Sequence, residues 1–430
     1  MALLLRGGRV VDAAAGIDAV LDIVVRDGLI VGVGEDLTIE KGDTIECAEK
    51  VILPGLADIH VHLRDPGQEY KETIASGTRA AAHGGFTAVA CMPNTDPICD
   101  SGSNVRFVVE RAAATAAVRV YPIGAVTAGQ EGEQLAEIGD MVAEGAVAFS
   151  DDGHGIQSAG MARVAMDYIR RFGAAYVAHC EDGSLAAGGV VNEGAVSTRM
   201  GLPGQPAEAE ETMVARDIAL AELTGCRLHL AHLSTARSVA LVREAKARGV
   251  NVTCEVTPHH AFLDEGALIG YDTNLKMNPP LRTAEDRAAL VEGLVDGTVD
   301  CLATDHAPHA PHDKELEFEL APFGTTGVET ALSLVNTHLV ATKRLDWAGV
   351  AQVMCHGPRA AVGLPSVRIE PGAVADLTIV DPEAKVEVSA EWFMSRSRNS
   401  AFLGQRLLGK ASEVIVGGHF ALKNGKVVGR

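Results

Sequence analysis

Two histidines separated by one residue, His60 and His62, end an apolar run within residues 51–67, VILPGLADIHVHLRDPG. Successive side chains in an extended strand point to opposite faces, so both imidazoles project from one face and Val61 from the other. Two imidazoles on one face of a strand end can bind a divalent metal ion. An HxH pair alone is a weak indication, so its meaning depends on residues elsewhere in the chain.

Two later strands carry metal-ligand residue types near their ends. In AVAFSDDG, Asp152 shares its strand phase with small residues, whereas Asp151 shares its phase with bulky Phe149. Bulky residues should face the surrounding helices, so we expect Asp152 to point inward and Asp151 not to. In RLHLAHLS, His229 and His232 are three residues apart, which predicts opposite faces; His232, nearer the strand end, is the expected ligand.

Two further strand ends complete the set. His179 ends AYVAHCED, and Asp305 shares its phase with Cys301 and Ala303 in DCLATDHAPH. A lone buried histidine is more often a hydrogen-bonded core residue, and we interpret the remaining candidates in that way: His83, His154, His229, His338, His259 and His260. Six ligand-type residues at the ends of five strands are much harder to explain by packing alone.

The elements that must position these residues alternate regularly. Eight apolar strand candidates occur at residues 57–62, 87–94, 119–126, 146–153, 175–182, 227–234, 251–260 and 300–309. Helical spacing of apolar residues follows each one, near 71–85, 102–117, 131–145, 158–172, 205–224, 235–248, 283–297 and 325–343. Eight such units predict an α/β fold of the TIM (β/α)8 barrel type, whose chemistry lies at the C-terminal strand ends. A doubly wound open sheet is the alternative, but no GxGxxG follows the first strand.

The sequence pattern at both ends of the chain differs from that of the middle. Residues 1–53 and 365–430 alternate short β-rich pieces with glycine turns, and neither end alone offers enough apolar residues for a core. We therefore expect the two ends to pack together as one small β-sandwich domain, with residues 54–364 forming the barrel.

The composition limits the classes of partner. The chain has 37 basic and 57 acidic residues, a formal charge of -20, which opposes binding to nucleic acid or to anionic membranes. A local cluster of cations can still bind an anionic small-molecule substrate. The N-terminal apolar run is too short for a signal peptide and no stretch suits a membrane span. Eight cysteines without a CxxC pair indicate buried free thiols in a reducing cytoplasm.

The donor set predicts the kind of metal centre. Four histidines and two aspartates suit zinc, but they are too many for one tetrahedral ion. We expect two Zn2+ ions per subunit, one held by His60, His62 and Asp305, the other by His179 and His232, with Asp152 and a hydroxide bridging them. Two ions roughly 3.5–4 Å apart lower the pKa of a bridging water enough to supply that hydroxide.

Eight motifs together resemble one superfamily. With HVHLRDPG, CMPNT, FSDDG, AHCED, AHLST, TPHH, NPPLR and DHAPH, nearly the whole chain resembles the amidohydrolase superfamily and, within it, the dihydroorotases. That resemblance implies reversible closure of N-carbamoyl-L-aspartate to L-dihydroorotate plus water, the third step of de novo pyrimidine synthesis. Many relatives bridge their metals with a carboxylated lysine on strand four. No lysine lies between Lys71 and Lys246 here, so the chain resembles the Asp-bridged type I class.

The resemblance also implies the remaining site residues. Asp305 would act as general acid and base. Arg64 shares the strand phase of His62 and could offer a bidentate fork to a substrate carboxylate, although a salt bridge to Asp65 or Glu69 is its alternative role. The positions that match substrate contacts of the family are His62, Asn94, Asn278, His309 and the backbone at Phe323 and Gly324. The charged segment 309–324, which runs from His309 to Gly324, is either a mobile lid or a passive loop.

Two other functions compete with this one. Another cyclic amidohydrolase, such as a hydantoinase or allantoinase, is opposed by Arg64 and by the missing strand-four lysine, and a substrate panel would discriminate. An inactive barrel that serves as a structural partner of aspartate carbamoyltransferase should have lost metal ligands, yet every ligand position is filled. The sequence leaves open both a homodimer and association of the active enzyme with aspartate carbamoyltransferase.

Overall fold

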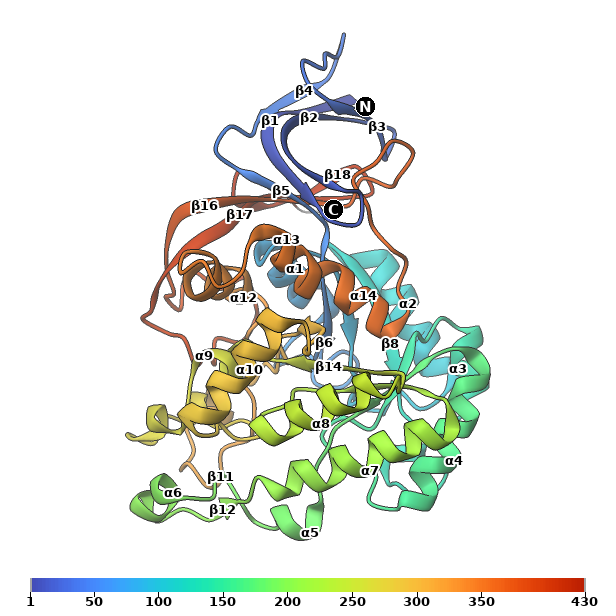
Figure 1. The fold of residues 1–430 in the computed structure, drawn as a ribbon, viewed down its shortest axis with the longest axis vertical. Helices are drawn as coiled ribbons and strands as arrows, with labels where there is room; N and C mark the ends of the chain where they lie inside the picture. The colour runs from blue at the N-terminus through green and yellow to red at the C-terminus, as the bar shows by residue number, and fades with distance from the viewer. Residues whose placement is uncertain (1, 429–430) are drawn as a thin grey trace.

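The structure, a computed structural model, describes residues 2–428 and is built around a barrel of eight parallel strands (Figure 1). The strands are hydrogen-bonded in chain order, and a backbone bridge between Val61 and His306 brings the eighth segment beside the first. The amide of His62 also donates to the His306 carbonyl at 2.9 Å, so the sheet closes on itself. The barrel strands are β6 (Leu56–Val61), β7 (Phe86–Cys91), β8 (Arg119–Gly124), β9 (Ala148–Ser150), β10 (Ala175–Ala178), β13 (Arg227–Leu230), β14 (Val252–Val256) and β15 (Cys301–Leu302). The predicted (β/α)8 barrel is confirmed.

Helices cover the outside of the barrel near the predicted positions. The principal ones are α1 (Ile74–His83), α2 (Gly102–Thr115), α3 (Ile138–Ala143), α4 (Ala159–Ile169), α7 (Glu208–Thr224), α8 (Ala236–Ala247), α10 (Ala284–Asp296) and α12 (Ala331–Val335). The third is much shorter than expected, and the eighth continues as a π-helix, Asn336–Val340. Sequence reasoning missed α13 (Trp347–Ala351), a π-helix at Gln352–His356 and α14 (Gly357–Val362), which lie between the barrel and the terminal sheet (Figure 1).

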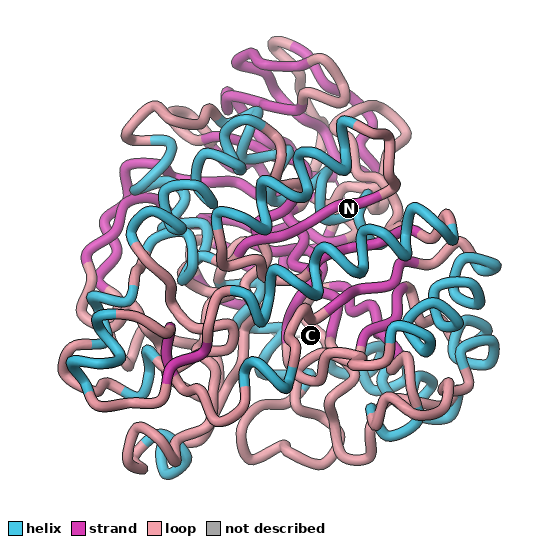
Figure 2. The backbone as a smooth tube through the Cα atoms, turned by 60° about the horizontal axis from the view of Figure 1, so that its bottom comes forward, coloured by secondary structure: helices cyan, strands magenta, loops and turns pink. Residues whose placement is uncertain are grey.

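Short elements decorate the loops. These are α5 (Gly183–Ala186), α6 (Ala195–Met200), α9 (Pro258–Phe262), α11 (Pro311–Lys314) and the two-stranded pair β11 (Val191–Asn192) and β12 (Gly204–Gln205). They belong to the connections that follow the C-terminal ends of the barrel strands. Figure 2 turns that loop-rich face toward the viewer.

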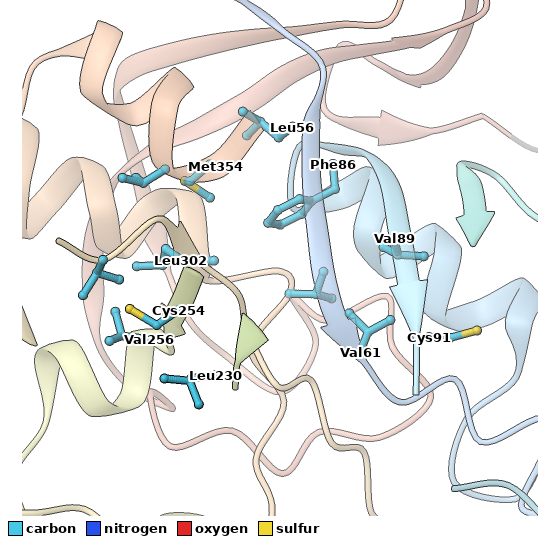
Figure 3. Close-up of a cluster of buried hydrophobic side chains, with 14 of the residues drawn as sticks. Leu56, Val61, Phe86, Val89, Cys91, Leu230, Cys254, Val256, Leu302 and Met354 are labelled. Carbon is cyan, nitrogen blue, oxygen red and sulfur yellow. The ribbon is translucent and has the colours of Figure 1, made fainter. Parts of the chain in front are cut away.

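Side chains alternate between two apolar layers along the barrel strands. Outward-facing residues pack under the helices, and Figure 3 shows Phe86, Val89 and Leu302 in this layer. The inner cluster contains smaller residues, among them Ala90, Ala148, Ala175, Cys301 and Ala303. Small inner residues fit the confined barrel interior and leave its upper end free for polar groups.

The two chain ends form one further sheet, as the glycine-rich strand texture predicts. Its strands are β1 (Ala2–Asp12), β2 (Ile17–Arg26), β3 (Leu29–Gly34), β4 (Asp43–Glu46), β5 (Val51–Pro54), β16 (Leu377–Glu387), β17 (Arg406–Val416), β18 (His419–Lys423) and β19 (Lys426–Val427). The sheet is continuous through nine strands and curls over its own apolar core, which includes Leu5, Ile23, Ile52 and Ile379 (Figure 1). Because β5 leads directly into β6, this sheet lies at the N-terminal strand ends, opposite the barrel mouth.

All eight cysteines are buried and unpaired, as expected from their spacing. Burial raises the pKa of their thiols, for example those of Cys226 and Cys355 to about 11. Within residues 2–428, none of the helices combines the length and apolar character that a bilayer span requires.

Candidate metal centre and substrate pocket

Two histidines from β6 and one aspartate after β15 converge at the barrel mouth. Asp305 Oδ1 lies 2.9 Å from His62 Nε2 and 3.5 Å from His60 Nε2. Ligand atoms of these three residues all lie within 4.8 Å of one another, and all three residues are buried. This is a spacing that one metal ion can occupy.

Asp152 lies at the centre of a second group. Its Oδ1 is 3.4 Å from His60 Nε2, 3.4 Å from His232 Nε2 and 3.6 Å from His179 Nδ1. Its other oxygen, Oδ2, is 3.6 Å from His62 Nε2. The carboxylate therefore faces imidazoles of both groups, which is the position required of a bridging ligand. The structure brings together all six residues that the strand ends predict.

The unpartnered atoms at the centre of this cluster fit a divalent cation. His60 Nε2 and Asp152 Oδ1 are buried and have no hydrogen-bond partner among the described residues. His179 Nδ1 and His232 Nε2 face each other at 2.9 Å, so at most one of the two can carry a proton there. Imidazole nitrogens and carboxylate oxygens that converge in a buried cluster are the ligand set that a metal ion such as Zn2+ binds when the imidazoles give up their protons.

The pKa shifts in the cluster also favour a bound cation. Burial disfavours the charged form of Asp152, but His60, His179 and His232 outweigh it and hold the pKa of that carboxyl well below its usual range. Burial likewise opposes charge on His60, yet Asp152, Glu255 and Asp305 raise its pKa well above the ordinary value. The positive charge of His60 thus balances the neighbouring carboxylates in the chain alone, and a bound cation would displace that proton.

Three residues of the site have left-handed backbone conformations that are uncommon outside glycine. The φ angles are 58° at Arg64, 32° at His232 and 47° at Asp305. Such conformations cost free energy and persist where the surrounding structure enforces them, often at functional sites. Each follows the end of a barrel strand and turns a polar side chain into the mouth.

The left-handed residue at 232 corrects one prediction. Strand phase places His229 and His232 on opposite faces, but β13 ends at Leu230 and the chain turns before His232. Both imidazoles therefore point into the barrel. His229 Nε2 lies 3.0 Å from Glu255 Oε2, one layer below the cluster, while His232 reaches Asp152. His229 is a hydrogen-bonded interior residue, as predicted, although its direction was predicted wrongly.

Asp151 and Asp152 have different surroundings despite being neighbours. Asp151 accepts hydrogen bonds from the amides of Val126 at 2.8 Å and Thr127 at 3.1 Å, and from the Thr127 hydroxyl. It fixes the loop after β8 and lies outside the metal cluster. The structure thus separates the two aspartates as strand phase predicts.

A pocket of about 340 Å³ opens beside the cluster and contains the predicted substrate contacts. The residues that line it include Arg64, Asn94, Asn278, His309, Phe323 and Gly324, together with His62 and Asp305. Gly324 has a φ of 127°, and a Cβ there would lie 2.8 Å from Ala307 Cβ, so the pocket wall requires glycine.

Arg64 is a buried cation that forms no salt bridge to a carboxylate among the described residues. Its Nε donates to the Pro308 carbonyl at 3.3 Å, and the two carboxylates expected as alternatives are engaged elsewhere: Asp65 faces Arg111, and Glu69 accepts from the Gly67 amide. Burial lowers the pKa of the guanidinium, but arginine remains charged at physiological pH. The pocket therefore contains a guanidinium that has no direct carboxylate partner among the described residues.

Other pocket groups are already hydrogen-bonded within the chain. His309 Nε2 lies 2.8 Å from the Phe323 carbonyl, and the Gly324 amide donates to the Lys276 carbonyl at 2.9 Å. Burial, together with the charges of Arg64 and lysines nearby, lowers the pKa of His309 to about 2, so its imidazole is neutral.

The segment 309–324 is anchored at several points. Lys314 is buried and its Nζ donates to the carbonyls of Pro322 at 2.7 Å and Thr273 at 3.0 Å. Lys276 Nζ donates to the Glu319 carbonyl at 2.8 Å and lies 4.7 Å from the Phe323 ring centroid. These contacts hold the segment against the preceding loop; whether it opens as a lid stays a prediction.

Comparison with known proteins places this site in a family. A family model described as Dihydro-orotase-like matches residues 49–238. Curated dihydroorotases of Pelotomaculum thermopropionicum and Acetivibrio thermocellus are 51% and 48% identical to this chain, over 99% and 100% of its length and 99% of their own. The chain belongs to the dihydroorotase family. It is therefore an enzyme of the cyclic amide hydrolase class.

Solved structures with the same architecture include hydantoinases. The L-hydantoinase (dihydropyrimidinase) of Arthrobacter aurescens superposes with a TM-score of 0.90 at 27% identity, over 99% of this chain and 97% of that chain. A D-hydantoinase from Thermus sp. gives a TM-score of 0.87 at 25% identity, over 100% and 97%. Members of the dihydroorotase family thus share their scaffold with enzymes named for other cyclic amides, and the pocket must supply the discrimination.

Two carboxylates next to this dihydroorotase site were missed by sequence reasoning. Glu255, inside β14, lies 2.6 Å from His60 Nδ1 and 3.0 Å from His229 Nε2. Burial opposes charge on this carboxyl, but the two imidazoles outweigh burial and lower its pKa to about 2. Glu181, which follows β10, accepts from Asn278 Nδ2 at 2.6 Å. An acidic residue inside the strand candidate NVTCEV is the signal that could have revealed Glu255, because a buried carboxylate requires partners.

Proposed function

We propose that this protein is a zinc-dependent dihydroorotase that interconverts L-dihydroorotate plus water and N-carbamoyl-L-aspartate in de novo pyrimidine synthesis. The observation that carries the proposal is Arg64, a buried guanidinium that forms no salt bridge with a carboxylate of residues 2–428, in the pocket beside the cluster of histidines and aspartates. Dihydroorotate differs from hydantoin and dihydrouracil in its carboxylate, and a guanidinium fork is suited to bind that group.

The six clustered residues are the proposed zinc ligands. His60, His62 and Asp305 would hold one ion, His179 and His232 the other, and Asp152 would bridge them. Bound zinc would supply an activated water and polarise the amide carbonyl. Glu255 accepts from His60 Nδ1, which fixes the tautomer that leaves Nε2 free to bind metal.

Asp305 is the proposed general acid and base. Burial disfavours its charge, but His60 and His62 outweigh that effect and hold its pKa below the ordinary value, so it starts as a carboxylate. In the hydrolytic direction, water adds to the amide carbonyl carbon and Asp305 accepts its proton. Asp305 then donates the proton to the ring nitrogen as the C–N bond breaks. Ring closure runs through the same steps in reverse.

The substrate contacts divide between charge and amide groups. Arg64 would bind the carboxylate, and Asn94 would assist as a donor, since its Oδ1 is engaged by His62 Nδ1 at 2.8 Å. Neutral His309 and the backbone of Phe323 and Gly324 would close the opposite wall. Asn278 would contact the ring.

The test is turnover of dihydroorotate beside hydantoin and dihydrouracil, with zinc content measured on the same protein. We expect activity on dihydroorotate alone, loss of activity on chelation, and recovery with zinc. Asp305→Asn removes both the proposed general acid and base and one proposed zinc ligand, so turnover should be lost and zinc content should fall. Preferential turnover of an uncharged ring by zinc-loaded protein would contradict the carboxylate-binding role of Arg64 and favour a hydantoinase.

A further inference from the structure

Glu181 lies at the edge of the pocket and collects hydrogen-bond donors on one oxygen. Its Oε2 accepts from Asn278 Nδ2 at 2.6 Å and from Gln205 Nε2 at 3.1 Å. The same oxygen lies 3.6 Å from His179 Nε2. Two side-chain amides from distant parts of the chain therefore share this carboxylate as their acceptor.

A carboxylate fixes the direction of any amide that contacts it. In its ionised form it has lone pairs and no hydrogen to donate, so the atom of Asn278 that faces Glu181 must be the NH2 group. The carbonyl oxygen, Oδ1, then points the other way. Oδ1 is buried and has no donor among residues 2–428, although Asn278 lines the pocket. The chain therefore leaves one oriented acceptor without a partner on a residue that lines the pocket.

Asn94, the second side-chain amide of the pocket, is oriented the other way, with its carbonyl oxygen engaged by the protein. His62 Nδ1 lies 2.8 Å from Asn94 Oδ1. With Nε2 of His62 as the proposed metal ligand, Nδ1 is the nitrogen that carries the proton and donates to that oxygen. The Asn94 NH2 group is left to act as a donor. The pocket thus has one amide locked as a donor by a histidine and one locked as an acceptor by a glutamate.

We infer that Glu181 is a positioning residue for specificity: it locks Asn278 with Oδ1 toward the ligand, so that the pocket requires an N–H group on its substrate. The inference rests on the proposed function, because the N–H groups in question are those of a cyclic ureide. A buried acceptor left unpaired is costly, and sites built to hydrogen-bond a ligand group discriminate strongly against ligands that lack it. Asn278 Oδ1 would then accept a hydrogen bond from a ring N–H group, while Arg64 binds the carboxylate.

Reversing the polarity of the pair provides the test. In Asn278→Asp, two carboxylates would face each other, and we expect the KM for dihydroorotate to rise at least about tenfold. In Glu181→Gln, the partner can donate or accept, so Asn278 is free to flip and KM should rise about two- to fivefold. The double variant combines both changes. The new glutamine at position 181 can donate to the new carboxylate at position 278, whose second oxygen again accepts from substrate, so KM should return to within about threefold of the parent.

The readout separates positioning from a structural role. The kcat should change less than KM in all three variants, and zinc content should stay unchanged, which controls for the contact between Glu181 and His179. Two dihydroorotates, each methylated at a different ring nitrogen, serve as competitors of the substrate. One of the two should bind the parent enzyme poorly, because it lacks the N–H group that Asn278 accepts. The Glu181→Gln variant should discriminate less against that compound. Asp182→Asn removes a neighbouring charge outside the pocket and is the matched control.

Absence of recovery in the double variant would overturn the inference, as would unchanged discrimination against the methylated rings in Glu181→Gln. Failure of the proposed function is a separate result. If the parent enzyme processes a different cyclic amide, the same three variants assayed on that amide still show whether Glu181 orients Asn278.

Discussion

Replacing the two adjacent aspartates one at a time should separate metal binding from folding stability. Asp152 faces four imidazoles at 3.4–3.6 Å, and no backbone amide within residues 2–428 donates to its carboxylate. Asp152→Ala removes the proposed bridge, so we expect zinc affinity to fall by more than the roughly 10–100-fold that loss of an outer partner produces. Activity should be lost with the metal.

Asp151→Ala is the matched control with the opposite expected outcome. It removes the acceptor of the Val126 amide, the Thr127 amide and the Thr127 hydroxyl. At about 1–3 kcal/mol for each buried donor left unpaired, and with some relaxation, the unfolding free energy should fall by roughly 3–5 kcal/mol. Zinc content at low temperature should stay at the parent value. Urea unfolding and metal analysis on both variants decide the matter: loss of zinc with Asp151→Ala but not with Asp152→Ala refutes the assignment.

Three further perturbations test other parts of the site. Glu255→Gln keeps the side-chain shape but weakens the support of His60, so zinc affinity measured against a chelating dye should fall about 10–100-fold, and an unchanged affinity would rule out that support. Arg64→Met should raise the KM for dihydroorotate about 10–100-fold, from loss of a charge-assisted contact, and equal KM values for the two proteins would argue against carboxylate binding. Burial lowers the pKa of Lys314 from 10.5 to about 7. Because the unfolded chain then binds more protons above pH 7, the unfolding free energy should rise by up to about 1.4 kcal/mol per pH unit between pH 7 and 9, and Lys314→Met should flatten this dependence in urea titrations.

The barrel could be predicted from the sequence because its strands are short apolar runs at regular spacing. The sequence also predicts which side chains face the barrel interior and which face the helices, since small residues such as Ala148 alternate with bulky ones such as Phe149. The elements after residue 343 were not predicted. They comprise α13, a π-helix and α14, and their burial depends on packing between the barrel and the terminal sheet. Arg359 in α14, for example, donates to the Gly55 carbonyl at 3.2 Å, a contact that no local pattern indicates.

The ligand-type residues could be predicted because parallel strands bring their C-terminal ends to one face. Strand phase selected Asp152 over Asp151 and aimed Asp305 into the mouth. It failed for the direction of His229, because phase applies only while the chain remains extended. The turn before His232 depends on a left-handed residue that is not glycine, and nothing in the residue type marks that conformation.

The residues that orient the site were the hardest to predict, for a reason that follows from their chemistry. Glu255 and Glu181 orient His60 and Asn278 through hydrogen bonds, and those partners are 195 and 97 residues away in the chain. A metal ligand shows itself by type and by position at a strand end, whereas an orienting carboxylate shows itself only when its partner's geometry is known. Fixing an imidazole tautomer or the direction of an amide changes no composition and no periodicity. It does decide which atom faces the ligand, and so a site predicted residue by residue from sequence still lacks the polarity that determines what it binds.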